Sequence, residues 1–176
     1  MTKRLRNMKR RGMSLVEILI YTAILAVLFV LVVNTVLTMA KSYTTLRLAK
    51  QINLAAATSL ERIAREIQNA ISVDQVQSVF GTSPGSLSLN TLDPVGNPKT
   101  IQFFIEDGAL RVREDGVDTG PMIGTKVTVT NLTFSYVESG PSEAVKIVMS
   151  LQTSLDDKIK TATFYDTIIL RGSYGQ

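Results

Sequence analysis

The chain has 176 residues, enough for one modest domain and one long helical element, and its 45% apolar content is too high for general disorder. It contains neither cysteine nor histidine, so disulfides, thiolate metal sites and histidine-dependent catalysis are excluded, and we name no catalytic residue and no cofactor. The net charge is +4, but six of the basic residues precede residue 13. The rest of the chain has 13 basic and 15 acidic residues, a balance that does not indicate a nucleic-acid-binding surface.

An uncharged apolar run extends from Ile18 to Ala40. As a helix it measures about 35 Å, which exceeds the roughly 30 Å hydrocarbon core of a bilayer. A secretory signal peptide has a shorter apolar core followed by a small-residue cleavage site, and no such site follows Val33. Here the small residue, Gly12, precedes the run, so the pattern predicts a membrane span rather than a secretory signal.

Glu17 lies at the start of this run. A charged residue at a helix centre costs about 2.5 to 3.5 kcal/mol on insertion scales, whereas each Leu, Ile, Phe or Val contributes about 0.3 to 0.6 kcal/mol. Twelve such apolar residues lie between Ile18 and Val33, and together they favour insertion by roughly 4 to 7 kcal/mol. Insertion is therefore favourable with Glu17 included, and the residues alone favour an interfacial carboxylate in the first helical turn.

The basic residues predict the orientation of the span. The cluster before the span consists of Lys3, Arg4, Arg6, Lys9, Arg10 and Arg11, against Lys41, Arg47 and Lys50 after it. The positive-inside rule then keeps the N-terminus in the cytoplasm and places everything past about Lys41 outside, as in a single-pass inner-membrane protein.

The string "GMSLVEILIYTAILAVL" resembles the N-terminus of type IV prepilins and of the pseudopilins of type II secretion. These proteins have a basic leader that ends in Gly, and a Glu four residues beyond the cleavage point. Gly12, Met13 and Glu17 match that spacing. Two departures are Met13, where the family usually has Phe, and the absence of a proline that kinks the helix of some pilins.

The resemblance implies that a prepilin peptidase cleaves between Gly12 and Met13 and methylates the new amine of Met13. Glu17 would then neutralise the terminal amine of a neighbouring subunit in a filament. The implied partners are this peptidase, other pilin or pseudopilin subunits, the assembly platform of the pilus or secretion system, and membrane lipid before assembly.

The sequence past Lys41 predicts an amphipathic continuation of the same helix, ending at about Ser72. Opposite charges four residues apart predict the pairs Glu61 with Arg65 and Arg62 with Glu66. An apolar stripe predicts packing on the sheet of the same chain, with a coiled-coil seam as the alternative; it consists of Ile52, Ala56, Leu60, Ile63, Ala64, Ile67 and Ile71.

The remaining residues predict an antiparallel sheet. Residues 81–98 predict a loop with one short strand at 86–89. Asp107-Gly108 predicts a two-residue hairpin turn, and the strand before it directs Ile101, Phe103 and Ile105 to one face of the sheet. A change of alternation near Asn131 predicts a bulge or bend between two strands. Two further strands are expected at 144–151 and 161–170, joined by the polar turn "TSLDDKIK"; their inward residues are Val145, Ile147, Met149 and Leu151, then Phe164, Ile168 and Leu170.

The predicted fold is therefore α+β, a long helix packed on an antiparallel sheet, which also resembles pilin architecture. We expect a cleaved leader at 1–12, a transmembrane and assembly helix at 13–40, an amphipathic helix at 41–73 and a loop and sheet domain at 74–176.

Other candidate sites are weaker. Solvated turns explain the acidic residues better than a calcium site does, because no EF-hand spacing is present; these residues are Glu106, Asp107, Glu114, Asp115, Asp118, Asp156 and Asp157. The glycines of "GVDTGPMIG" do not follow a strand into a helix, which disfavours a phosphate loop. Tyr136, Tyr165 and Tyr174 could form an adhesive surface, although alternation directs Tyr136 inward.

Two functions follow from these features. The first is a structural filament subunit, a minor pilin or pseudopilin stored in the membrane after cleavage. The second is an uncleaved, single-pass surface binding or adhesion module. An anchored hydrolase is disfavoured by the missing His and Cys, although Ser/Lys or carboxylate chemistry remains formally open.

Overall fold

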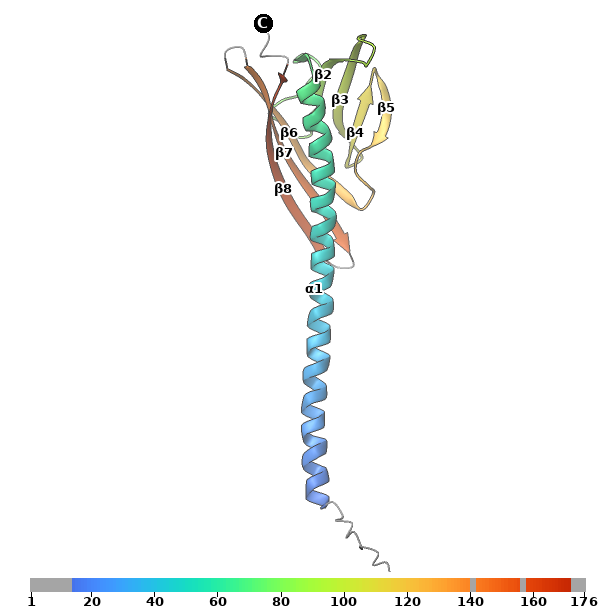
Figure 1. Cartoon of the computed structure of the whole chain (residues 1–176), viewed down its shortest axis with the longest axis vertical. Coiled ribbons are helices and arrows are strands. Elements are labelled where there is room, and N and C mark those ends of the chain that lie inside the picture. The colour runs from blue at the N-terminus through green and yellow to red at the C-terminus, as the bar shows by residue number, and fades with distance from the viewer. Residues whose placement is uncertain (1–13, 140–141, 156–157, 172–176) are drawn as a thin grey trace, which may run out of the picture. The chain divides into compact units, whose positions relative to one another are not determined.

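The computed structural model describes residues 14–139, 142–155 and 158–171, and the chain divides into an N-terminal unit, residues 1–43, and a C-terminal unit, residues 44–176. Helix α1 (Leu15–Asn69) passes through both units (Figure 1). The strands described after it are β1 (Ser72–Val73), β2 (Leu87–Leu92), β3 (Pro98–Glu106), β4 (Ala109–Glu114), β5 (Val117–Pro121), β6 (Val127–Ser139), β7 (Ser142–Leu155) and β8 (Lys158–Ile169). This order of elements confirms the predicted α+β class.

Helix α1 ends earlier than the sequence predicted. It stops at Asn69 instead of about Ser72, because the next residues join a sheet: the Ile71 amide donates to the Asn90 carbonyl at 2.8 Å, and β1 pairs with β2. Ile71, the last residue of the predicted stripe, is consequently outside the helix and half-exposed.

The part of α1 in the C-terminal unit packs on the sheets of its own chain, as predicted. Its buried residues are Leu48, Ile52, Ala56, Ser59, Ile63 and Ile67, most of which share one hydrophobic core with inward residues of the strands. Leu60 and Ala64 are only partly buried at the edge of this core. Leu48 and Ser59 extend the buried stripe beyond the residues expected from the sequence.

The strands described form two antiparallel sheets rather than one, in the orders β1-β2-β3-β4-β5 and β6-β7-β8. The sheets adjoin where the Val129 amide of β6 donates to the Gly108 carbonyl in the turn between β3 and β4, at 2.8 Å. The segment before β2 also contacts β6, because the Gly81 amide donates to the Phe134 carbonyl at 2.8 Å. Strand β5 was missed because its sequence, VDTGP, lacks apolar alternation and four of its five residues are exposed.

The predicted β3–β4 hairpin is confirmed. Asp107 and Gly108 have φ angles of 52° and 72°, the left-handed conformation required by a tight two-residue turn, and Glu106 pairs with Ala109 across it. The irregularity predicted from the change of alternation near Asn131 is also confirmed, as a register shift between Val129 and Asn131. It lies within the single strand β6, however, and does not separate two strands.

Strands β7 and β8 are longer than predicted, because most of "TSLDDKIK" belongs to them. Thr153 pairs with Lys160 and Leu155 with Lys158. The expected inward residues of β7 are all buried, as are Ile168 and Leu170 after them, whereas Phe164 is partly buried; the four in β7 are Val145, Ile147, Met149 and Leu151.

Candidate functional site

The candidate site is the start of α1. Gly12 and Met13, the residues of the predicted cleavage point, lie outside the described residues. The helix begins where the Ser14 carbonyl accepts a hydrogen bond from the Ile18 amide at 3.2 Å. Ser14 and Glu17 thus have the spacing of a capping box, and a carboxylate in this first turn interacts favourably with the helix dipole.

Glu17 also has a side-chain partner that the sequence analysis did not identify. The Tyr21 hydroxyl donates to Glu17 Oε1 at 3.2 Å. The four-residue spacing of Glu17 and Tyr21 in the sequence could have indicated this contact, because it places two helical side chains on the same face. Since the donor is neutral, the hydrogen bond orients the carboxylate but supplies no countercharge to it.

Every described residue from 14 to 43 is exposed. Leu15 is 80% exposed, and Leu25 and Phe29 are 69% and 68% exposed. Burying one such side chain is favourable by about 1.5 to 3 kcal/mol, so this surface is stable only when lipid or protein covers it. Within the described residues, α1 is the one helix long and apolar enough to cross a membrane, judged by length and composition, and none of its most apolar window is buried.

The hydroxyl groups of this segment are largely satisfied within the helix. Thr22, Thr35 and Thr38 donate to backbone carbonyls three or four residues earlier, at distances from 2.8 to 2.9 Å. A polar group that bonds within its own helix needs no water, so these residues cost less in lipid than their side chains suggest.

A shallow groove of about 510 Å³ runs along the same segment. The small residues Thr22 and Ala26, one turn apart, line it together with apolar residues that include Leu25, Phe29 and Val32. Small residues at this spacing allow a neighbouring helix to approach closely.

Four of the acidic residues considered for calcium are engaged by basic groups or by a backbone amide: Glu106, Glu114, Asp115 and Asp118. Arg111 contacts Glu106 and Asp118, and its hydrogen bond holds the pKa of Asp118 below the usual value. Glu114 binds Lys99 Nζ at 2.6 Å and Arg62 at 3.4 Å, so Arg62 does not pair with Glu66 as predicted.

Asp115 accepts a hydrogen bond from the Thr100 amide, and Asp156 and Asp157 lie outside the described residues. In the part of the chain that the structure describes, no three acidic side chains are arranged to hold a metal ion. The predicted Glu61–Arg65 pair is confirmed at 2.9 Å.

Of the three tyrosines considered for adhesion, the two that the structure describes do not form one surface. Tyr136 is directed inward as predicted, lies 6.0 Å from the Phe80 ring between centroids, and has its pKa raised by burial. Tyr165 is 70% exposed, and Tyr174 lies outside the described residues.

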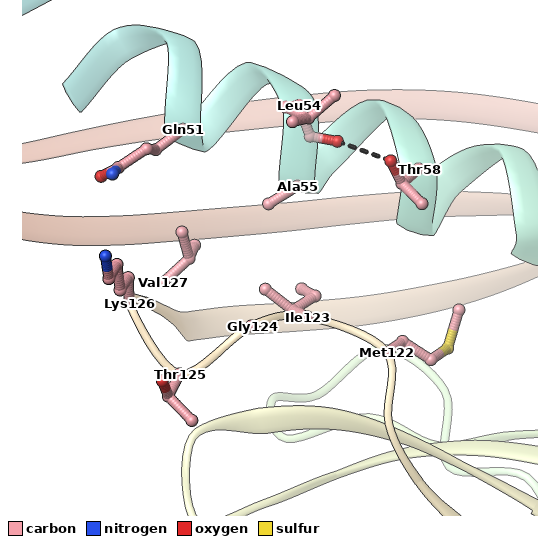
Figure 2. A pocket seen from close by; sticks show the side chains of 10 residues that line it. All are labelled: Gln51, Leu54, Ala55, Thr58, Met122, Ile123, Gly124, Thr125, Lys126 and Val127. Atoms are coloured by element: carbon pink, nitrogen blue, oxygen red, sulfur yellow. Dashed lines mark hydrogen bonds between the residues drawn. The ribbon is translucent and has the colours of Figure 1, made fainter. Parts of the chain in front are cut away.

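The C-terminal unit has an open pocket of about 410 Å³ between α1 and residues 122–127 (Figure 2). Its lining is mainly apolar and includes Leu54, Met122 and Val127. Figure 2 shows the side chains of Gln51 and Lys126 on facing walls at the same end of this pocket.

Residues 7–33 match the family model described as "Prokaryotic N-terminal methylation motif", the signature of type IV prepilin-like proteins. No curated protein and no solved structure matches the chain. The motif supports a type IV pilin-like protein and implies processing by a prepilin peptidase and assembly with other pilin subunits. Together with the long apolar helix, it fits a membrane-anchored protein.

Proposed function

The chain carries the signature of type IV prepilin-like proteins, and we propose that it is a minor pilin or pseudopilin, a structural subunit of a pilus-like or secretion filament. Residues 1–12 form the leader, and prepilin peptidase cleaves between Gly12 and Met13 and methylates the Met13 amine. Residues 13–40 span the membrane and later pack in the filament, 41–73 continue the helix, and 74–176 form the exposed domain.

The exposure of residues 14–43 carries this proposal. The described residues of this segment bury none of their own apolar side chains, whereas the C-terminal unit buries a core of its own. Lipid covers the segment while the protein is stored in the membrane, and neighbouring helices cover it after extraction. The groove at Thr22 and Ala26 is one surface on which a neighbouring helix can pack.

Glu17 supplies the electrostatic part of assembly. A charge without a partner is costly in an apolar bundle, and removing one member of a buried pair costs about 3 to 5 kcal/mol. Tyr21 orients the Glu17 carboxylate but does not neutralise it. The methylated amine of Met13 from a neighbouring subunit is the countercharge.

The orientation follows from the basic residues before the span. The leader remains in the cytoplasm, where the peptidase and the assembly platform act, and the residues past Lys41 lie outside the inner membrane.

Processing is tested by mass spectrometry of the protein from membranes and from sheared surface filaments. The expected chain begins at methylated Met13 in both fractions. An intact leader in filaments, or a protein never recovered from them, refutes the proposal and favours the uncleaved surface binding module.

The role of Glu17 is tested with Glu17→Gln and the matched variant Tyr21→Phe. Glu17→Gln removes the charge but still accepts a hydrogen bond, so we expect normal membrane insertion and at least a tenfold loss of filament incorporation. Tyr21→Phe removes only the hydroxyl and should reduce incorporation much less. Equal incorporation of Glu17→Gln and the unaltered chain would rule out the pairing.

A further inference from the structure

The C-terminal unit separates its charges between two regions. At the end where the chain arrives from the apolar segment, α1 carries Arg47 and Lys50, and three lysines come from other elements: Lys126, Lys158 and Lys160. All five are exposed, and we call this set the basic end.

The contacts in the sheet place the three lysines together. Val127, Thr153 and Lys160 are paired in one row across β6, β7 and β8, so they share one face of the sheet and span about 10 Å. The Thr153 hydroxyl donates to the Lys126 carbonyl at 2.7 Å. Lys158 lies two residues before Lys160 and on the same face.

The helix brings its two basic residues to the same place. Gln51 lines the pocket together with Lys126 and Val127, and Figure 2 shows the Gln51 and Lys126 side chains at one end of it. Arg47 lies four residues before Gln51 and therefore on the same side of the helix, and Lys50 is three residues after Arg47.

The remaining surface of this unit has the opposite charge. The basic end carries five basic residues, and the two acidic residues between β7 and β8, Asp156 and Asp157, reduce its formal charge to +3. The rest of residues 44–176 contains seven basic and twelve acidic residues, a formal charge of −5. An acidic partner therefore meets this unit in a preferred orientation, with the basic end toward the acidic surface.

The position of the basic end in the chain identifies that surface. Arg47 and Lys50 follow Lys41, the first charge after the apolar run, by about 9 and 14 Å along a helix. Basic residues this close to a membrane-spanning run lie in the juxtamembrane region, where anionic headgroups attract them within about one Debye length, about 10 Å at 0.1 M salt. Leu46, which is 69% exposed and four residues before Lys50 on α1, supplies an apolar contact beside the charges.

We propose that the basic end binds the anionic headgroups of the bilayer that holds the apolar segment, and so holds the C-terminal unit against the membrane before filament assembly. This inference rests on the proposed function only in assuming a membrane-stored form. When the subunit leaves the bilayer these contacts are lost, so anionic lipid stabilises the stored state relative to the filament.

The test uses the full chain in lipid nanodiscs of phosphatidylcholine, with or without 30% phosphatidylglycerol. Since the chain has no cysteine, Thr125→Cys gives a single labelling site beside Lys126. Energy transfer from this label to acceptors on the headgroups reports the approach of the domain to the bilayer. We expect greater transfer in the anionic discs, and no difference between the two lipids at about 1 M salt, where the Debye length is about 3 Å.

The variants determine which residues act. Lys126→Gln with Lys160→Gln should remove at least half of the lipid-dependent difference. The matched pair Lys146→Gln with Arg171→Gln removes the same charge from exposed positions outside the basic end and should leave the difference unchanged. Equal urea midpoints of the variants confirm that folding is intact.

Three outcomes overturn the proposal. The first is the same energy transfer in both lipids, and the second is an equal loss of transfer in the two variant pairs. The third is binding of duplex DNA to the protein in neutral discs with the same dependence on Lys126 and Lys160, which would identify a general polyanion surface. Both leaflets of a disc have the same composition, so this experiment does not depend on the orientation of the chain. It does not measure cleavage either, so a negative result here leaves the N-terminal mass test of the proposed function unaffected.

Discussion

Phe29 and Phe134 have the same side chain in opposite surroundings. Phe29, in the N-terminal unit, is 68% exposed, whereas Phe134, in the C-terminal unit, is fully buried. The C-terminal unit covers its own apolar residues with a helix and two sheets, and the N-terminal unit covers none of its described ones. One part of the chain is thus a complete folding unit, and the other depends on lipid or on other chains.

The strongest test of this difference is to remove the same ring from each unit. Phe134→Ala leaves a cavity beneath β6, so we expect a loss of about 3 to 5 kcal/mol in the unfolding free energy of the domain. Phe29→Ala should leave that free energy unchanged. Urea unfolding of the full chain in detergent, followed by tyrosine fluorescence, measures both.

Membrane insertion gives the complementary measurement. Phe29→Ala removes only about 0.3 to 0.6 kcal/mol of the insertion free energy, so the segment should still insert. If Phe29→Ala destabilised the domain by more than about 1 kcal/mol, the two units would share a core and the contrast between them would fail.

A substitution at Ser59 is expected to raise the unfolding free energy of the domain, by less than Phe134→Ala lowers it. Its hydroxyl is fully buried in α1 and has no hydrogen-bond partner among the described residues. Ser59→Ala removes an unsatisfied polar group and improves helix propensity, so it should stabilise the domain by about 1 kcal/mol in the same unfolding assay.

Thr58→Ala is the matched control for Ser59. The Thr58 hydroxyl is exposed and donates to the Leu54 carbonyl at 2.9 Å, so its removal should change stability by no more than about 0.5 kcal/mol. A destabilised Ser59→Ala would mean that the hydroxyl is satisfied, and the core would then be less apolar than the burial pattern indicates.

Local sequence patterns predicted the elements that local geometry determines. Asp107-Gly108 specified a turn with two left-handed residues, and the change of alternation near Asn131 specified a register shift. The spacing of Gly12 and Glu17 identified the N-terminal motif because that signature is contained in one short stretch.

Features that depend on distant residues were not predictable in this way. Arg62 has Glu66 one turn away in sequence but pairs with Glu114, because folding places β4 beside the helix. The division into two sheets depends on contacts such as that between Val129 and Gly108, which no alternation pattern reveals. Similarly, a count of charges gave a nearly neutral domain and could not show that the fold separates them.

Glu114 gives a test of how firmly the helix and the first sheet are joined. It binds Arg62 on α1 and Lys99 on β3, and these side chains are only partly exposed. Glu114→Gln should cost up to about 1 kcal/mol in unfolding free energy, because ion pairs near a surface contribute little more. Glu61→Gln breaks the more exposed pair with Arg65 and should cost less. Equal effects would indicate that the Arg62–Glu114 contact does not stabilise the packing of α1.

The smallest expected effect is a dependence of the C-terminal unit on acid pH. The hydrogen bond from Arg111, and then the Gly120 amide, hold the pKa of Asp118 below its usual value, so the folded state binds this proton less readily than the unfolded state. The stability contributed by Asp118 is therefore fully present above about pH 4 and is lost as the pH falls through its folded pKa. Asp118→Asn should reduce the change in urea midpoint between pH 6 and pH 3.

Asp107→Asn is the control for this pH dependence. It removes the same charge from the neighbouring β3–β4 turn, where asparagine tolerates the left-handed conformation. Its midpoint should decrease with acid as much as that of the unaltered chain. If Asp118→Asn were as sensitive to acid as Asp107→Asn, the contact with Arg111 would not persist in solution. The acid response would then come from other carboxylates of the domain, such as Asp93, whose pKa is lowered by its hydrogen bonds with Asn97.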